Sequence, residues 1–137
     1  KHYLDKIKID IKEVEFIALV IKEKKKYFLT NNQKLISFNE DFNKIYLHQI
    51  YGKNGEIFFK DFYEKLLKNQ FNINLIKGFY FFQINRWDLI LNNNLLVKFP
   101  INELEESIIL ANELIKKSKF KNVKIIDLRI KGRVVVQ

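Results

Sequence analysis

The most constraining feature of this chain is a stretch that has the pattern of a strand, a tight turn and a second strand. Apolar residues dominate 87–91 and 95–99, and the asparagines at 92–94 separate them. Asparagine tolerates the positive φ angles of tight turns, so the stretch predicts a β-hairpin. Pro100 ends the second strand, because proline has no N–H for a sheet ladder.

The end of the chain has a second hairpin pattern. The strand-like residues 126–129 are followed by a Lys131-Gly132 turn and by a last strand over 133–137. A last strand tends to lie at a sheet edge, where unpaired N–H and C=O groups can bind another chain by strand addition. The apolar run 134–136 interrupts the alternation of a strand with one covered face. This fits either a strand covered on both faces or an edge strand that gains a partner.

Other strand patterns are spread along the chain. Residues 16–21 are continuously apolar, as in a central strand, and Gly78 predicts a bulge or bend within a strand over 73–84. Further strands are predicted over 7–13, 27–29, 35–38 and 45–51.

Two amphipathic helices are predicted between the strands. Asn54 or Gly55 begins the first helix, and Asn102 with Glu105 predicts a capping box at the start of the second. Their apolar faces consist of Phe58, Phe59, Phe62, Tyr63 and Leu66 in the first helix and of Leu104, Ile108, Ala111 and Ile115 in the second. The order of elements predicts an α+β domain, in which two helices pack on a curved, mainly antiparallel sheet with an exposed C-terminal edge strand.

The formal net charge of +9 raises the possibility of a nucleic-acid-binding module, because clustered Lys and Arg neutralise phosphates. Nearly all of the positive charge is lysine, and Lys, Asn, Ile and Phe are abundant together, which is typical of an AT-rich genome. The run Lys24–Lys26 falls at an expected turn. Solvated turns and faces are therefore the favoured interpretation, and nucleic-acid binding is the alternative.

The residues that could support catalysis or bind a metal are few. The chain has no Cys, His2 lies near its start, and His48 lies within a predicted strand among apolar neighbours, where a structural role is favoured. No nucleotide-binding, zinc-protease or nucleophile-elbow motif is present. We therefore expect no catalytic residue, no cofactor, no metal and no enzymatic activity.

The aromatic residues 79–82 could form a stacking platform for single-stranded nucleic acid. A strand buried on both faces, packed against the Phe-rich helix, is the favoured interpretation. The chain also opens with Lys1 and contains no Met, so we expect a segment of a longer protein, whose membrane anchor, if it has one, lies elsewhere.

Several motifs resemble the extracytoplasmic β domain of the FtsQ/DivIB family of bacterial cell-division proteins. The stretch 86–93 resembles the family's "RWxLxLxNG" strand and turn, with Asn94 in place of Gly, and 97–100 is similar to "VKLP". Residues 126–129 contain the family's terminal "DLR". Residues 9–18 are similar to a junction "VxExxPVA", although Phe16 replaces the proline. The similarity runs from about Ile7 to Val136.

This resemblance implies a fold and a location. Family members are single-pass proteins of the inner membrane in which a POTRA domain precedes the β domain on the periplasmic side. Residues 1–13 would then be the end of a POTRA-type domain, and residues 14–137 the FtsQ-type β domain.

The resemblance also implies partners and a site. The β domain would be a non-enzymatic scaffold at the division site that binds the division proteins FtsB and FtsL. Carried over by position, the contacts fall on Arg129, Ile130, Lys131, Gly132, Arg133, Val134, Val135 and Val136. Ile130 stands where some members carry Tyr, and the arginines suggest an acidic partner segment. The isolated domain could also form a homodimer through its bare edge.

Overall fold

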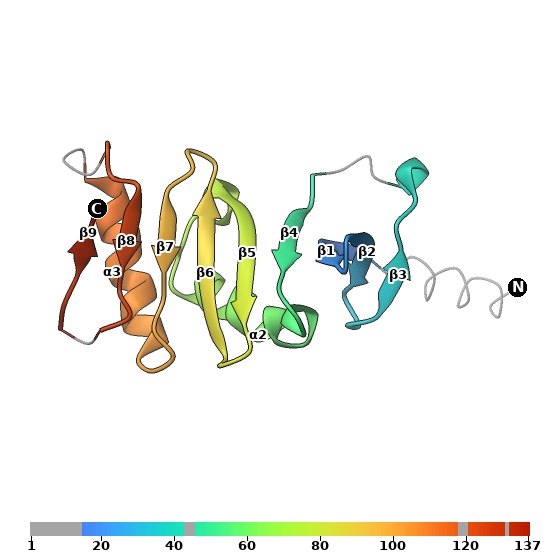
Figure 1. The fold of residues 1–137 in the computed structure, drawn as a ribbon, viewed down its shortest axis with the longest axis horizontal. Helices are drawn as coiled ribbons and strands as arrows, with labels where there is room; N and C mark the ends of the chain where they lie inside the picture. Colours follow the sequence, from blue (N-terminus) through green and yellow to red (C-terminus); the bar gives the residue numbers. More distant parts are fainter. Residues whose placement is uncertain (1–14, 43–45, 118–120, 131) are drawn as a thin grey trace, which may run out of the picture.

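The computed structural model describes residues 15–42, 46–117, 121–130 and 132–137 (Figure 1). The strand predicted over 7–13, and with it the proposed end of a POTRA-type domain, lies outside these residues.

The described strands form one nine-stranded sheet in the order β3-β2-β1-β4-β5-β6-β7-β8-β9 (Figure 1). The strands are β1 (Phe16–Lys22), β2 (Lys25–Thr30), β3 (Leu35–Ser37), β4 (His48–Tyr51), β5 (Ile76–Phe82), β6 (Arg86–Leu91), β7 (Leu96–Lys98), β8 (Ile125–Asp127) and β9 (Val135–Val136). The helices are α2 (Gly55–Lys68) and α3 (Leu104–Lys116), with short 3₁₀ turns η1 (Glu40–Phe42) and η2 (Ile73–Leu75).

Most neighbouring strands are antiparallel, as predicted. The pairs β1–β4, β4–β5 and β7–β8 are parallel. Each parallel pair is joined by a long connection: the β2–β3 hairpin, α2 or α3. Parallel neighbours require such crossovers, whereas the short hairpins give antiparallel pairs. The predicted α+β class is confirmed.

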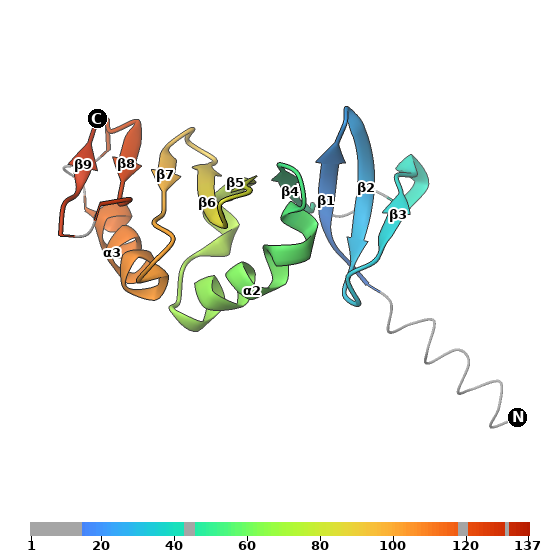
Figure 2. The same ribbon diagram turned by 60° about the horizontal axis from the view of Figure 1, so that its bottom comes forward.

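Both helices lie on the same side of the sheet (Figure 2). Beneath α2, the buried aromatic rings of Phe59, Phe62, Phe79 and Trp87 pack together. Phe62 and Trp87 are stacked, with ring centroids 5.1 Å apart and planes 3° from parallel. Burying rings of this size contributes most of what such a core gains from removing apolar surface from water.

The apolar faces differ from the prediction in two places. Phe58, predicted to face the sheet, is 42% exposed and stacks on Phe81 at the margin of the helix. Strand β5 is not buried on both faces as expected. Phe79 and Phe81 are buried beneath α2, whereas Phe82 on the opposite face is 40% exposed. The helices cover one face of the sheet here, so the other face stays accessible.

The predicted start of the second helix is also wrong. Glu103, not Asn102, is the N-cap of α3; it has a positive φ of 57° and no side-chain capping bond. The Glu105 carboxylate instead accepts a hydrogen bond from the Asn69 side chain and pairs with Lys68 of α2. The tertiary contact between the two helices therefore replaces the local capping box. The bulge predicted at Gly78 is confirmed, because the β5–β6 register shifts between Ile76 and Gly78.

Two glycines with positive φ provide a matched pair of variants that test how closely Gly52 packs against β5. A Cβ at Gly52 would lie 2.1 Å from the Phe81 carbonyl oxygen, whereas one at Gly132 would meet no atom within 4 Å. We expect Gly52→Ala to lower the free energy of unfolding by about 3 kcal/mol or more, and Gly132→Ala by about 1 kcal/mol, the cost of a left-handed backbone alone. Urea unfolding of both variants measures the difference. Equal losses would contradict the close contact at Gly52.

Candidate protein interface at the terminal edge

Strand β9 forms one edge of the sheet, as predicted (Figure 1). The Gln137 N–H donates to the Ile125 carbonyl at 2.9 Å, and the Ile125 N–H donates to the Gln137 carbonyl at 3.0 Å. Backbone groups of successive residues in a strand point to opposite sides. Since Gln137 is directed toward β8, Val135 shares that direction, and the N–H and C=O groups of Val134 and Val136 point outward. These are the groups that a further strand would bind.

Of the predicted contact residues, Val135 and Val136 form β9, and Arg129, Ile130, Gly132, Arg133 and Val134 lie in the connection between β8 and β9. Ile130 is 58% exposed, Val134 39% and Val136 37%, and Val135 is half-buried. Arg129, Gly132 and Arg133 are exposed, and Lys131 lies outside the described residues. The apolar run at 134–136 therefore does not belong to a strand covered on both faces. Of the two explanations that the sequence left open, the accessible edge strand fits.

A row of alternating charges crosses the face of the sheet that the helices do not cover. Asp88 of β6 is in register with Lys98 of β7, and Lys98 is in register with Asp127 of β8. Directly opposed side chains on neighbouring strands lie close enough to interact, and opposite charges stabilise the pair. This row of Asp88, Lys98 and Asp127 ties three strands together beside the edge.

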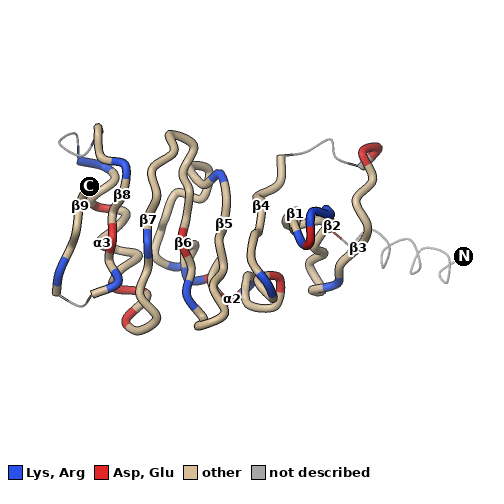
Figure 3. The backbone as a smooth tube through the Cα atoms, viewed as in Figure 1, with Lys and Arg blue, Asp and Glu red and all other residues tan. Residues whose placement is uncertain are grey.

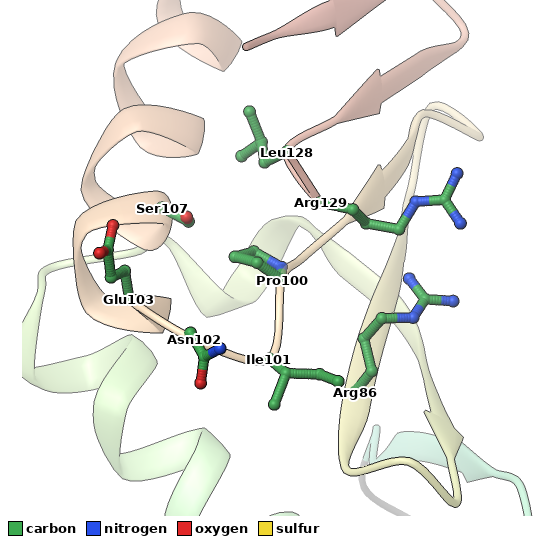
Figure 4. Close-up of a pocket in the computed structure, with 8 residues that line it drawn as sticks. All are labelled: Arg86, Pro100, Ile101, Asn102, Glu103, Ser107, Leu128 and Arg129. Atoms are coloured by element: carbon green, nitrogen blue, oxygen red, sulfur yellow. The ribbon is translucent and has the colours of Figure 1, made fainter. Parts of the chain in front are cut away.

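Two arginines lie beside the acids of this row. The Arg86 guanidinium donates to Asp88 at 2.5 Å, and the Arg129 guanidinium binds Asp127 through two hydrogen bonds of 2.9 and 2.7 Å. Pro100 lies between them, and both guanidinium groups extend to the same side, away from α3 (Figure 4). Along the row of Asp88, Lys98 and Asp127 the charges alternate in sign. Between the two arginines, by contrast, there is a proline and no acidic side chain.

The two acids of the row have opposite pKa shifts. Burial raises the pKa of Asp88, which is 5% exposed, and this outweighs the opposing effect of Arg86. The hydrogen bonds from Arg129 lower the pKa of Asp127. Both carboxylates hold an arginine in place, but Asp127 lies nearer to solvent.

Two pockets follow this end of the sheet. One, of about 410 Å³, is lined by Arg86, Pro100, Ile101, Asn102, Glu103, Ser107, Leu128 and Arg129 (Figure 4). The next, of about 310 Å³, extends along α3 to Ile130, Gly132, Arg133 and Val134. Because the two share Glu103, Ser107 and Leu128, they form one continuous depression that ends beside β9.

The family resemblance predicts Arg129 as a site residue, but Arg86, Asp88 and Lys98 were not predicted. All four lie on the open face of the sheet, the face that the helices do not cover. Their neighbours in the chain, Trp87, Val97 and Leu128, are buried on the other face. This alternation can be recognised in the sequence. The cross-strand register that brings the charges together cannot be recognised there.

Elsewhere in the described part of the chain, the charges are dispersed. Lys and Arg are scattered over strands, turns and helices, with Asp and Glu among them, rather than gathered in one stripe (Figure 3). His48 binds the Ile73 carbonyl at 2.9 Å and packs against Phe79, a structural role as expected. The residues that the structure describes include no group of three acidic or histidine side chains able to hold a metal ion, and no helix long and apolar enough to cross a membrane.

The fold and this edge define an α+β domain with helices on one sheet face, a charged row on the other and an accessible terminal strand. The family described as "cell division protein FtsQ/DivIB, C-terminal" matches residues 18–129. The chain therefore belongs to the FtsQ/DivIB family, a family of non-enzymatic division scaffolds with a role at the division site. Comparison with curated proteins gives no match.

The Asp127–Arg129 pair gives a pH-dependent prediction. A carboxyl whose pKa is lowered by folding stabilises the protein above its ordinary pKa of 3.8, and the stabilisation is lost as the pH falls through the folded-state value. We expect Asp127→Asn to lower the free energy of unfolding by about 1 kcal/mol at pH 7, with the difference shrinking below about pH 4.

Denaturant unfolding from pH 7 to pH 2.5 measures this difference. Asp61→Asn is the control, because Asp61 is 76% exposed in its pair with Lys65 and the change should cost less than about 0.5 kcal/mol. A difference for Asp127→Asn that stays constant down to pH 2.5 would contradict the assignment.

Proposed function

We propose that this domain is a scaffold module of the cell-division machinery that binds the partner proteins FtsB and FtsL, with a partner segment adding a strand to β9. The observation that carries the proposal is the accessible edge of β9, at which Val134 and Val136 direct their backbone groups outward. An added strand would form main-chain hydrogen bonds there, while side chains set specificity. Of the described residues predicted for this contact, Val135 and Val136 form this edge strand, and the others lie in the connection that leads to it from β8.

The arginines favour an acidic partner. Arg86 and Arg129 flank Pro100, where the alternation of charges would place an acid, and each guanidinium has further N–H donors beyond those bound to Asp88 or Asp127. A carboxylate between them would complete the pattern. Planar guanidinium groups bind carboxylates in fixed geometry, so this contact would set the register of the added strand.

The same family relationship also supports a proposed location. We place the domain on the periplasmic side of the inner membrane, held there by an anchor and a preceding POTRA-type domain outside the described residues. In that position the β9 edge would be available to the extracytoplasmic segments of FtsB and FtsL.

A proline at an outward-facing position tests strand addition. We expect Val136→Pro to weaken binding of the extracytoplasmic segment of the cognate FtsB about tenfold, because it removes an outward N–H and places a ring against the incoming strand. The inward-facing bonds of Gln137 and Val135 remain, so the thermal midpoint should change little.

Ser37→Pro is the matched control. It lies on β3, at the opposite edge of the sheet, and its N–H also points outward, because the flanking residue Phe38 donates to the Lys26 carbonyl. Calorimetric titration of both variants compares the two edges. If Ser37→Pro weakens binding as much as Val136→Pro, or neither does, strand addition at β9 is wrong.

The arginine pair is tested separately. We expect Arg86→Gln and Arg129→Gln each to weaken binding about tenfold at low salt and less at 0.5 M salt, because a partly exposed charge pair is screened. Lys116→Gln at the end of α3 is the control and should have no effect. Tight binding of a DNA or RNA oligomer that falls steeply with salt would instead favour the nucleic-acid alternative.

A further inference from the structure

The sheet has a second edge strand, β3, at the end opposite to β9 (Figure 1). The Lys34 carbonyl and the Phe38 N–H form hydrogen bonds of 2.9 and 3.2 Å with residues of β2. Backbone groups of successive residues in a strand point to opposite sides, so the N–H and C=O groups of Leu35 and Ser37 point outward. In the part of the chain that the structure describes, both edges of the sheet therefore offer unpaired backbone groups.

The two edges match in length and in side chains when β9 runs antiparallel to β3 of another copy. Residues 134–136 then lie opposite residues 35–37, and the outward groups of the two strands meet in hydrogen-bonded pairs. Val135 and Ile36 form the pair between them, in which side chains lie closer together. Val135 is half-buried and Ile36 is 42% exposed, so the contact would remove apolar surface from water.

Charge favours this antiparallel direction. The exposed acids Glu40 and Asp41 follow β3 in the turn η1, and the exposed Arg133 lies shortly before β9. The ion pairs among the described residues use none of these three side chains. In the antiparallel register the long Arg133 side chain reaches toward the acids, because diagonal neighbours on paired strands can interact. A parallel pairing would instead bring Arg133 toward Lys34.

We propose that copies of this domain associate head to tail, with β9 of one copy adding antiparallel to β3 of the next. The contact joins two different surfaces, so each added copy presents a further unpaired edge, and association does not stop at a dimer unless a ring closes. Both strands are short, which places the contact among small, weak interfaces. A symmetrical pairing of β9 with β9 offers Arg133 no acid, because residues 133–137 contain none.

The head-to-tail contact uses the same edge of β9 to which a partner segment would add. Strand addition by the partner and association between copies would therefore exclude each other, and a bound partner would release single domains from the assembly. This exclusion rests on the proposed function. The head-to-tail contact itself does not.

Two variants, each blocked at one edge, test the contact. In sedimentation velocity up to about 1 mM protein, we expect the unmodified domain to grow beyond a dimer and Ser37→Pro and Val136→Pro each to remain monomeric, because each lacks one outward N–H. A mixture of the two variants should form a dimer and nothing larger, since one retains β9 and the other retains β3. A mixture that stays monomeric would overturn the proposal. Ser37→Pro that dimerises alone would show the symmetrical β9 contact instead.

A charge variant tests the same contact without changing either backbone. We expect Glu40→Lys to weaken the association about fivefold at low salt and less at 0.5 M salt, and the added change Arg133→Glu to restore it. Glu113→Lys is the matched control: it changes the net charge equally but lies exposed on α3, away from both edges. Equal effects of Glu40→Lys and Glu113→Lys would contradict the pairing of Arg133 with η1.

The extracytoplasmic segment of the cognate FtsB separates this proposal from the proposed function. We expect the segment to dissociate the assembly into complexes that contain one domain each. If it binds and the assembly persists, the exclusion is wrong. If the segment does not bind while the two proline variants still pair, the head-to-tail contact stands and partner addition at β9 is wrong. If the segment binds and the variants do not pair, the reverse holds.

Discussion

The packing of Trp87 beneath α2 determines where the charged residues of the candidate site lie. Trp87 is 4% exposed and stacks on Phe62, so β6 cannot rotate without removing this ring from the core. Because side chains alternate along a strand, Arg86 and Asp88 must then face the opposite side of the sheet. A slip of one residue would turn both charges into the aromatic core, at a cost far above that of any surface contact. The aromatic core therefore fixes the charged row.

Strand β8 is fixed independently and in the same way. Ile126 and Leu128 are buried against the helix-covered side, which places Asp127 and Arg129 on the open face. Two strands, each held by its own buried residues, thus present one arginine each on either side of Pro100. Asp88 and Asp127 then hold the guanidinium groups at the surface of the sheet. The arginine pair is rigid before any partner arrives, which reduces the entropy that binding would cost.

The sequence was sufficient for the features that depend on local pattern. The two helices, the hairpin turns and the bulge at Gly78 follow from periodicity and turn chemistry, and the terminal edge follows from the last strand pattern. The predicted N-cap at Asn102 was wrong because Glu105 contacts α2 instead, a tertiary preference that no local rule contains. Likewise, Arg86 and Arg129 are 43 positions apart in sequence, and only the register of β6, β7 and β8 brings them together.

The edge strand β9 differs from β6 and β8, which buried residues hold in place. Strand β9 has two residues, and Val136, the one that shares a face with Ile126, is still 37% exposed. Little buried surface holds it, so it can adjust to an added strand at small cost. Main-chain hydrogen bonds alone do not select one register over another, because every residue offers the same groups. In the proposed complex, β9 would therefore supply an adaptable attachment, while the fixed arginine pair would select the partner sequence and its register.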